Sequence, residues 1–364
     1  MKGLIAPSAP QKGEHVTEQP QTGNIISNGS STAPNRIDKL AIVVVTFKRQ
    51  ELLAKLFDSF CGLTRAPWRI IIVDNENSEQ TRQMVEDLGR RTDELWGVDG
   101  ETPDAEGGTA RVVYAPQEDN LGGAGGFSAG VKRAYELGAE WFWVMDDDVM
   151  VVPEAIERLE PWTHDHRVVQ GSRYDYDGGP FYWQYHFIVP LGIPNPIAPA
   201  AFDDSGFRTM NTMCFEGGLF ARSVVEEIGF PDPRFFIYWD DTVYGYLASK
   251  VTESIVVSDI ILQRSRDIPN WDIAGVRQLN GTSDMNRYHI MRNRGYMMQY
   301  FRLHGDYNRF LFGLGTAATF AKEVIRLIAV DHKFKTGMPA LFRGMRDARK
   351  IYRDKTWKPM PPLK

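Results

Sequence analysis

Cysteine is almost missing from this chain of 364 residues, which has only Cys61 and Cys214. Two cysteines cannot build a disulfide framework or a cysteine-rich zinc finger, so a reducing compartment is the default expectation. Hydrophobic residues make up 43% and charged residues 24% of the chain, values that are ordinary for a globular protein. This length suits one large α/β domain with additions, or two modest domains.

Long apolar runs are missing as well. No uninterrupted apolar stretch reaches the roughly 18 residues that a membrane-spanning helix needs, so the sequence predicts no such span. We also expect no secretory signal peptide, because no apolar core of sufficient length follows Lys2.

A strong net charge is the third absence, since the formal charge is only -5. The basic residues are nevertheless unevenly placed. Residues 321–364 contain 12 Lys or Arg and 4 Asp or Glu, a surplus of eight positive charges. Such a segment favours an anionic surface, either lipid headgroups or nucleic acid. A solvated helical face would give the same pattern, and the charge count alone does not separate these interpretations.

The order of the predicted elements indicates a parallel, doubly wound α/β sheet. Residues 1–37 are rich in small and polar residues with little apolar content, which predicts disorder. Beyond them, short apolar runs alternate with segments of helical spacing, as expected for strands and helices that follow one another in a parallel sheet. The predicted strands are 40–46, 69–73, 111–114 and 141–145. The predicted helices are 51–60, 78–89, 127–137, 284–301, 307–329 and 340–352.

Polar residues stand where the predicted strands end. Thr46, Asp74 and Asp146 each close a strand, and Asn120 follows the third one. Ligands bind outside the carboxyl ends of the strands in such sheets, so we expect these side chains to share one site. Asp74 and Asn120 would suit a nucleoside, although each could equally be a turn or cap residue. Arg49 would face a base, a phosphate or solvent.

Three successive carboxylates, Asp146, Asp147 and Asp148, follow the apolar run 141–145. Adjacent anions repel one another and resist desolvation, so they require a counter-charge. A divalent metal bound to a diphosphate would supply it, and hard oxygen ligands favour Mg²⁺ or Mn²⁺. The alternative is an acidic turn that caps the helix expected near Pro153.

Four glycines lie just before the helix predicted over 127–137, at positions 122, 123, 125 and 126. Glycines at a helix N-terminus allow the backbone to approach a phosphate closely. Their spacing matches neither the G-x-G-x-x-G pattern nor the Gly-Lys-Ser/Thr ending of the nucleoside-triphosphate loop. A tight turn that needs positive φ explains them equally well.

A second acidic cluster, Trp239-Asp240-Asp241, follows an apolar, proline-marked segment. Carboxylates beside Trp become partly desolvated, which raises their pKa toward values useful to a general base. They could also cap a helix that starts at Thr242. Glu216, which precedes two glycines, could bind the hydroxyl groups of an acceptor. It could also be a buried acid whose carboxylate is fully hydrogen-bonded within the core.

His289 is the best-placed neutral partner for a metal at the acidic triplet, although a lone histidine is more often structural. Arg292 and Arg294 follow it closely. Two guanidinium groups at this position could neutralise a diphosphate.

Together these motifs resemble the inverting nucleotide-sugar glycosyltransferases of family 2, which have the GT-A fold. The matching segments are 42–49, 73–75, 120–126, 146–148 and 239–241. The resemblance extends over about residues 40–300. It implies a GT-A (Rossmann-like), largely parallel mixed sheet flanked by helices over residues 38–302, between a disordered extension 1–37 and a basic helical extension 303–364.

The resemblance also assigns roles to these residues. The donor nucleotide would be bound by Thr46, Arg49, Asp74, Asn120, Gly123, Asp146 and Asp147. A Mn²⁺ or Mg²⁺ ion would be bound by Asp146, Asp148 and His289. Asp241 would take the proton from the acceptor hydroxyl as this attacks the anomeric carbon. Asp240 would be its catalytic neighbour, and Glu216 and Trp239 would shape the acceptor pocket.

Within the family, the Asn-Leu-Gly-Gly-x-Gly-Gly-Phe run and both acidic clusters look like the actinobacterial galactofuranosyltransferases of cell-wall galactan. The chain length favours the smaller, initiating type. This implies UDP-galactofuranose as donor and a rhamnosyl-N-acetylglucosaminyl-diphosphate polyprenol as acceptor. The basic segment would hold the enzyme at the cytoplasmic face of the plasma membrane, with no nucleic-acid partner. The alternatives are a related enzyme that uses another donor, such as dTDP-rhamnose, and a non-catalytic lipid- or nucleic-acid-binding protein.

Overall fold

The computed structural model describes residues 37–98, 111–179, 183–197, 202–267, 271–273, 276–279 and 281–364. These residues belong to one compact unit, Asn35–Lys364. The extension predicted to be disordered, residues 1–37, lies outside the described residues except for Ile37.

The first half of the described chain confirms the predicted alternation of strands and helices. Parallel strands lie in the order β3-β2-β1-β4. Their bounds are β1 Leu40–Thr46, β2 Arg69–Asp74, β3 Val112–Pro116 and β4 Trp141–Asp146. The connecting helices are α1 Gln50–Phe60, α2 Glu79–Trp96 and α3 Gly122–Leu137. Ser78 caps α2 as expected, because its hydroxyl accepts from the backbone N–H of Thr81.

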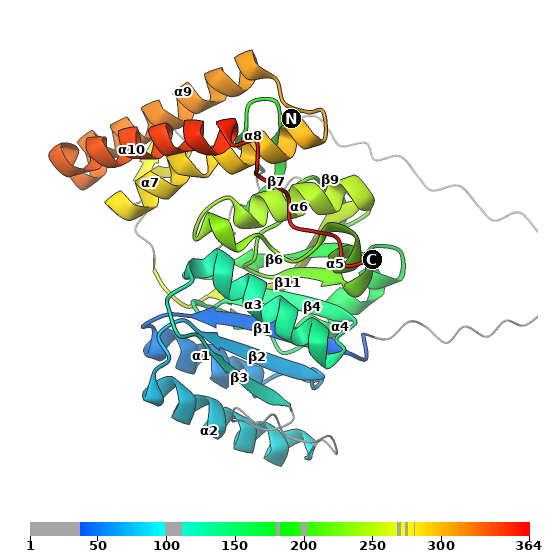
Figure 1. Ribbon diagram of the computed structural model, residues 1–364. Helices are drawn as coiled ribbons and strands as arrows, with labels where there is room; N and C mark the ends of the chain where they lie inside the picture. Colours follow the sequence, from blue (N-terminus) through cyan, green and yellow to red (C-terminus); the bar gives the residue numbers. More distant parts are fainter. Residues whose placement is uncertain are drawn as a thin grey trace, which may run out of the picture. The chain divides into compact units, whose positions relative to one another are not determined.

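Alternate residues of β1 pack on opposite faces of the sheet. Ile42 and Val44 belong to the apolar cluster that contains α1 and α2, whereas Val43 and Val45 pack with α3. Figure 1 shows these helices on the two sides of the strands. All seven residues of β1 are buried, as expected for a strand that is covered on both faces.

The second half continues the same sheet with mixed directions. In the described residues the strand order runs on from β4 through β10, β6, β11 and β5, and β9 pairs with β11. The bounds are β5 Val149–Val151, β6 Val168–Tyr174, β9 Phe207–Met210, β10 Gly218–Ala221 and β11 Ser254–Arg264. β10 is antiparallel to β4, and β11 is parallel to β6. The predicted mixed, largely parallel sheet is therefore confirmed.

The described residues of this half also form short helices and two hairpins. The helices are α4 Ala155–Leu159, η1 Glu160–His164, α5 Arg222–Ile228, η3 Pro233–Phe235 and α6 Asp240–Val251. The hairpins are β7 Trp183–Ile188 with β8 Ile193–Ile197, and β12 Trp271–Ile273 with β13 Val276–Leu279.

The chain ends in a group of helices, drawn in yellow to red in Figure 1. They are α7 Asp284–Arg292, α8 Arg294–Leu303, α9 Arg309–Arg326, the π-helical turn η4 Leu327–Asp331 and α10 Phe334–Arg353. The single helix predicted over 284–301 is divided at Asn293. Gly344 of α10 packs so closely on α7 that an added Cβ would lie 2.5 Å from the carbonyl oxygen of Tyr288. Within the described ranges, no helix combines the length and the apolar composition that a membrane crossing requires.

Candidate active site

The strand ends of the first half meet at one edge of the sheet. Thr46 is in register with Asp74, and Val45 with Asp146. Glu216 reaches the same edge, because β10 begins opposite Val144 of β4. The sheet therefore brings together the ends of β1, β2 and β4, as the strand-end argument predicted.

The acidic triplet is held by side chains of the β1–α1 loop. The hydroxyl of Thr46 donates to Oδ2 of Asp147 at 2.7 Å. Nη1 of Arg49 donates to Oδ1 of Asp147 at 2.9 Å and to Oδ2 of Asp148 at 3.3 Å. Thr46 and Arg49 were predicted to bind the donor nucleotide, and in this structure their contacts fix the orientation of the carboxylates.

Three further arginines, which sequence reasoning missed, surround the acidic residues. Nη2 of Arg266 lies 3.2 Å from Asp148. Glu216 pairs with Arg173 at 2.8 Å and with Arg264 at 3.3 Å. Arg173 and Arg264 stand near the ends of β6 and β11, so the strand-end rule would have found them had these strands been predicted.

Asp146 carries the largest electrostatic penalty of the triplet. Desolvation raises its pKa well above the usual range, and the charges of Asp148, Glu216 and Asp147 raise it further, while Arg49 acts in the opposite direction. A cation bound here would stabilise the anionic form of Asp146. The donor chemistry of Asp146 and Asp148 therefore fits a hard divalent ion such as Mg²⁺ or Mn²⁺.

The predicted third metal ligand does not join these two carboxylates. Among the described residues, no group of three His, Cys, Asp or Glu side chains is arranged to hold a metal ion. His289 instead stacks on Phe236, with ring centroids 5.0 Å apart. Burial, followed by the charge of Arg292, lowers the pKa of His289 to about 4, so the ring is neutral. These three side chains are therefore not grouped in this structure, and the role of His289 as a metal ligand stays a prediction.

The second acidic cluster begins helix α6. Oδ1 of Asp241 accepts from the backbone N–H of Thr242 at 2.6 Å and from its hydroxyl at 3.2 Å. Desolvation, followed by the charge of Asp241, raises the pKa of Asp240 to about 8. Desolvation also raises the pKa of Asp241, whereas the bonds from Thr242 and from the Cys214 thiol lower it. Burial therefore opposes a full negative charge on both carboxyl groups at once.

The triplet and the acid pair meet around one ion pair, Arg173–Glu216. The charge of Glu216 contributes to the raised pKa of Asp146. Arg173, its partner, lowers the pKa of Asp241. Each cluster thus interacts with one member of the same ion pair, and the prediction that the two clusters serve one site is consistent with this arrangement.

Asp74 and Asn120 have local partners. Asp74 is fully buried and accepts from the backbone N–H groups of Glu76 and Ser78, and from the hydroxyl of Tyr114 at 2.8 Å. Oδ1 of the exposed Asn120 accepts from the N–H of Gly122 at 2.9 Å. Both residues take the turn and cap roles, and their role in nucleoside binding stays a prediction.

The glycine run is the first part of α3 and does not precede the helix, which corrects the predicted start at 127. Gly122 has φ +68, and an added Cβ would lie 2.2 Å from the carbonyl oxygen of Phe236. The N–H of Ala124 donates to the same oxygen at 3.0 Å. A Cβ at Gly123 would meet open space. The glycines therefore bring the start of α3 against the segment that precedes the acid pair.

Two predicted phosphate-binding arginines are used elsewhere. Arg294 is 1% exposed and donates to the carbonyls of Leu191 and Gly192. Arg292 donates to the carbonyls of Arg234 and Phe235. Both guanidinium groups therefore bind backbone carbonyls, and their role in neutralising a diphosphate stays a prediction.

Trp239 directly precedes the acid pair and has a fixed orientation. Its indole Nε1 donates to the carbonyl of Ile290 at 3.1 Å, and its ring lies 6.3 Å from that of Phe187. Its place in an acceptor pocket stays a prediction, as does that of Glu216, whose two carboxylate oxygens are paired with arginines.

A mixed sheet that carries an acidic triplet at its carboxyl edge and a second acid pair on a nearby helix has the architecture of a GT-A glycosyltransferase. Residues 41–229 match the family model "Glycosyl transferase family 2", and the chain belongs to this family.

Curated relatives include galactofuranosyltransferases. The chain is 29% identical over 205 residues to galactofuranosyltransferase GlfT1 of Mycolicibacterium smegmatis, which is 55% of this chain and 61% of that protein. It is 35% identical over 108 residues to GlfT1 of Mycobacterium tuberculosis, which is 29% of each chain. The chain thus spans less than two thirds of these relatives.

Among solved structures, S. aureus TarS 1-349 in complex with UDP-GlcNAc superposes with a TM-score of 0.51 and 14% identity. The match covers 86% of this chain and 81% of TarS 1-349, and it shows a shared fold.

Proposed function

We propose that this protein transfers galactofuranose, with inversion, from UDP-galactofuranose to a rhamnosyl-N-acetylglucosaminyl-diphosphate polyprenol. The main support is that Asp146 of the triplet interacts with Glu216 and Asp241 of the acid pair with Arg173, and that Arg173 and Glu216 form one ion pair. The similarity to GlfT1 supports the donor sugar. The UDP-GlcNAc that TarS binds supports the nucleotide class.

In this proposal the acid pair moves the proton. Asp240 holds a proton near neutral pH, because its pKa is about 8. Asp241 is the proposed base, and hydrogen bonds from Thr242 fix its carboxylate. It takes the proton of the acceptor hydroxyl as that oxygen bonds to the anomeric carbon and UDP leaves from the opposite face.

The triplet serves the departing nucleotide. Thr46 and Arg49 hold Asp147, and Arg266 holds Asp148, so the carboxylates keep one arrangement before the donor binds. A Mn²⁺ or Mg²⁺ ion bound by Asp146 and Asp148 would stabilise the negative charge of the diphosphate.

Helix α9 supports a peripheral contact with the cytoplasmic face of the plasma membrane. Three large apolar side chains of α9 are exposed at helical spacing, and Ile328 of η4 is exposed as well. Their exposed fractions are 72% for Phe310, 49% for Leu314, 52% for Ile325 and 58% for Ile328. Exposed apolar stripes beside basic residues are typical of helices that lie in a lipid interface. A polyprenol-linked acceptor would lie in this membrane. An exposed apolar stripe therefore favours a lipid surface over nucleic acid as the binding partner.

The direct test is to incubate the protein with Mn²⁺, a panel of UDP- and dTDP-sugars and a synthetic rhamnosyl acceptor, and to analyse the products by mass spectrometry. We expect the wild type to add a hexose from UDP-galactofuranose and the Asp241→Asn variant to add it far more slowly. If dTDP-rhamnose is the only donor from which sugar is transferred, the protein is instead a related family 2 enzyme that uses another donor. No transfer from any donor would favour a non-catalytic role.

A further inference from the structure

The backbone just before the acid pair has an unusual conformation. Phe236, Tyr238 and Trp239 have φ of 65°, 68° and 70°. These values lie in the left-handed region, which large residues rarely adopt and which persists only when the surrounding structure enforces it. The next two residues are Asp240 and Asp241, so the conformation of this segment sets the direction in which the acid pair points.

One side chain holds the carbonyl groups of this segment. The amide Nδ2 of Asn293 donates to the carbonyl oxygens of Phe235 at 2.9 Å, Ile237 at 2.8 Å and Tyr238 at 2.9 Å. Asn293 is fully buried, with 0% exposure. These three acceptors flank or belong to the residues with positive φ, so one buried amide binds carbonyl oxygens on both sides of Phe236.

Arg292 reinforces this arrangement. Its Nε donates to Oδ1 of Asn293 at 2.8 Å, which fixes the orientation of the amide. Its Nη2 donates to the carbonyls of Arg234 at 2.6 Å and Phe235 at 2.7 Å. Together, Arg292 and Asn293 thus bind the backbone carbonyls of residues 234, 235, 237 and 238.

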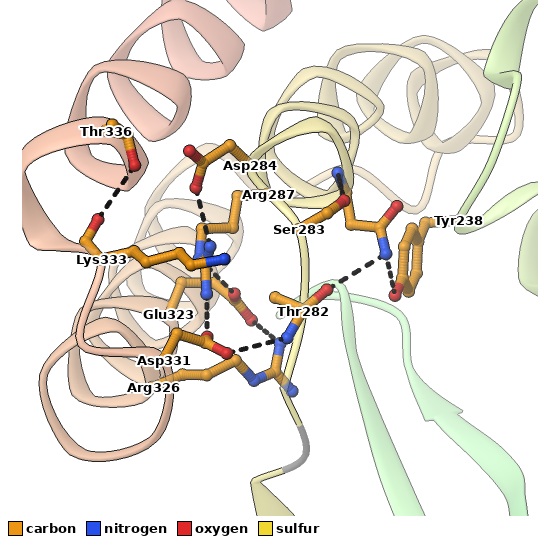
Figure 2. A network of polar contacts seen from close by, with 11 residues as sticks. Tyr238, Thr282, Ser283, Asp284, Arg287, Glu323, Arg326, Asp331, Lys333 and Thr336 are labelled. Atoms are coloured by element: carbon orange, nitrogen blue, oxygen red, sulfur yellow. Dashed lines mark hydrogen bonds and ion pairs between the residues drawn. The ribbon is translucent and has the colours of Figure 1, made fainter.

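Helix α7 adds two further contacts to the same segment. Ile290 accepts from the indole of Trp239, and Nδ2 of Asn286 donates to the hydroxyl of Tyr238 at 3.3 Å. Figure 2 shows Tyr238 on one side of the helix start.

The same helix is anchored on its other side by buried charge. Arg287 has 0% exposure and forms ion pairs with Asp284, Glu323 and Asp331, which tie α7 to α9 and η4 (Figure 2). Arg326 completes the network by pairing with Glu323 at 2.7 Å. The support of the segment is therefore itself rigidly held.

We infer that Asn293, assisted by Arg292, is a positioning residue for glycosyl transfer: it holds residues 234–239 in the strained conformation that directs Asp240 and Asp241 into the site. It acts through the acid pair and does not touch the substrate. This inference rests on the proposed function in one respect, since it assumes that the acid pair carries the proton.

Gln299 offers a matched control. It is 1% exposed, and its amide Nε2 donates to three backbone carbonyls, those of Ile351, Tyr352 and Asp354. It lies on α8, only a few residues from Asn293, but it holds the end of α10 and not the acid-pair segment. Gln299→Ala therefore removes a similar buried amide at a comparable structural cost.

We expect Asn293→Ala to lower kcat by about 10- to 100-fold, because a small displacement of catalytic groups has effects of this size. The KM for the donor should stay close to that of the wild type, and Gln299→Ala should keep wild-type kcat despite a similar loss in Tm. Equal kcat values for Asn293→Ala and the wild type, or equal losses in both variants, would overturn the inference. If Asn293→Ala does not fold, Arg292→Ala takes its place in this experiment. We expect Arg292→Ala to lower kcat by a smaller factor. An unchanged kcat in Arg292→Ala would overturn the inference.

Hydrogen–deuterium exchange separates this inference from the proposed function, because it needs no substrate. Faster exchange of residues 234–241 in Asn293→Ala, but not in Gln299→Ala, supports the positioning role even if the wild type does not use UDP-galactofuranose. Unchanged exchange in this segment contradicts it. Failure of the wild type to transfer sugar in the product assay refutes the proposed function alone.

Discussion

The two acidic clusters of this protein differ in how their charge is balanced. The triplet at the end of β4 is surrounded by guanidinium groups, of which Arg49 and Arg266 contact it directly. The pair at the start of α6 has backbone and hydroxyl donors, and its carboxyl groups repel each other. The first arrangement suits the binding of a cation and a diphosphate. The second suits the uptake of a proton.

The largest effect is expected at the triplet. Asp146→Ala or Asp148→Ala should abolish sugar transfer, because each removes one predicted metal ligand, and an excess of chelator should do the same to the wild type. Initial rates with UDP-galactofuranose measure the loss. Asp87→Ala, which alters an exposed acid of α2, is the control and should keep full activity. Normal turnover in excess chelator would contradict a metal at this site.

A smaller but still large effect is expected at the acid pair. Asp241→Asn keeps the shape of the side chain but removes the proton acceptor, so kcat should fall by about 10³-fold. Because the triplet is unchanged, UDP should bind with wild-type affinity in titration calorimetry. Glu227→Gln, a surface substitution on α5, controls for the loss of one charge. An active Asp241→Asn variant would exclude this residue as the base.

The pH dependence of stability should also separate the clusters. The pKa of Asp240 is about 8 in the folded chain, against an ordinary value of 3.8. Between these values the folded chain binds more protons than the unfolded chain, so the free energy of unfolding decreases as the pH rises. Asp240→Asn removes this contribution.

Thermal unfolding between about pH 5 and about pH 8 measures this difference. We expect the Tm of the wild type to fall more steeply with rising pH than that of Asp240→Asn. Parallel curves for the two proteins would show that Asp240 titrates normally.

The smallest effect on catalysis is expected from the surface of α9. Replacing Phe310 and Ile325 by Ser should weaken binding to vesicles of anionic phospholipid, because both side chains are largely exposed and apolar. Transfer to a short soluble acceptor should be unchanged. Ala317→Ser and Ala318→Ser, on the same helix, provide the control. Unaltered vesicle binding would contradict the proposed membrane contact.

Much of the fold could be predicted from the sequence, because the first half follows simple periodicities. β1, β2 and β4 are buried apolar runs that end in polar residues, and their parallel register brings Thr46, Asp74 and Asp146 to one edge. The sequence alone could not reveal that Arg173 and Arg264 reach the same edge. They come from β6 and β11, whose pairing depends on long-range contacts.

The roles of single polar residues were harder to predict. His289 is in the expected region of the chain, but its ring packs on Phe236 and does not reach the triplet. Asn293 was expected inside one continuous helix, and its amide is instead used by three carbonyls of a distant segment. Such partners lie more than 50 residues away in sequence, so local patterns contain no signal for them.

The central claim is that both acidic clusters act on one sugar. A crystal structure of the Asp241→Asn variant with Mn²⁺ and UDP-galactofuranose tests this directly. We predict a diphosphate beside Asp146 and Asp148, and residue 241 facing the anomeric carbon across a space that admits one acceptor hydroxyl. A donor sugar that points into a cavity separate from residue 241 would contradict the account.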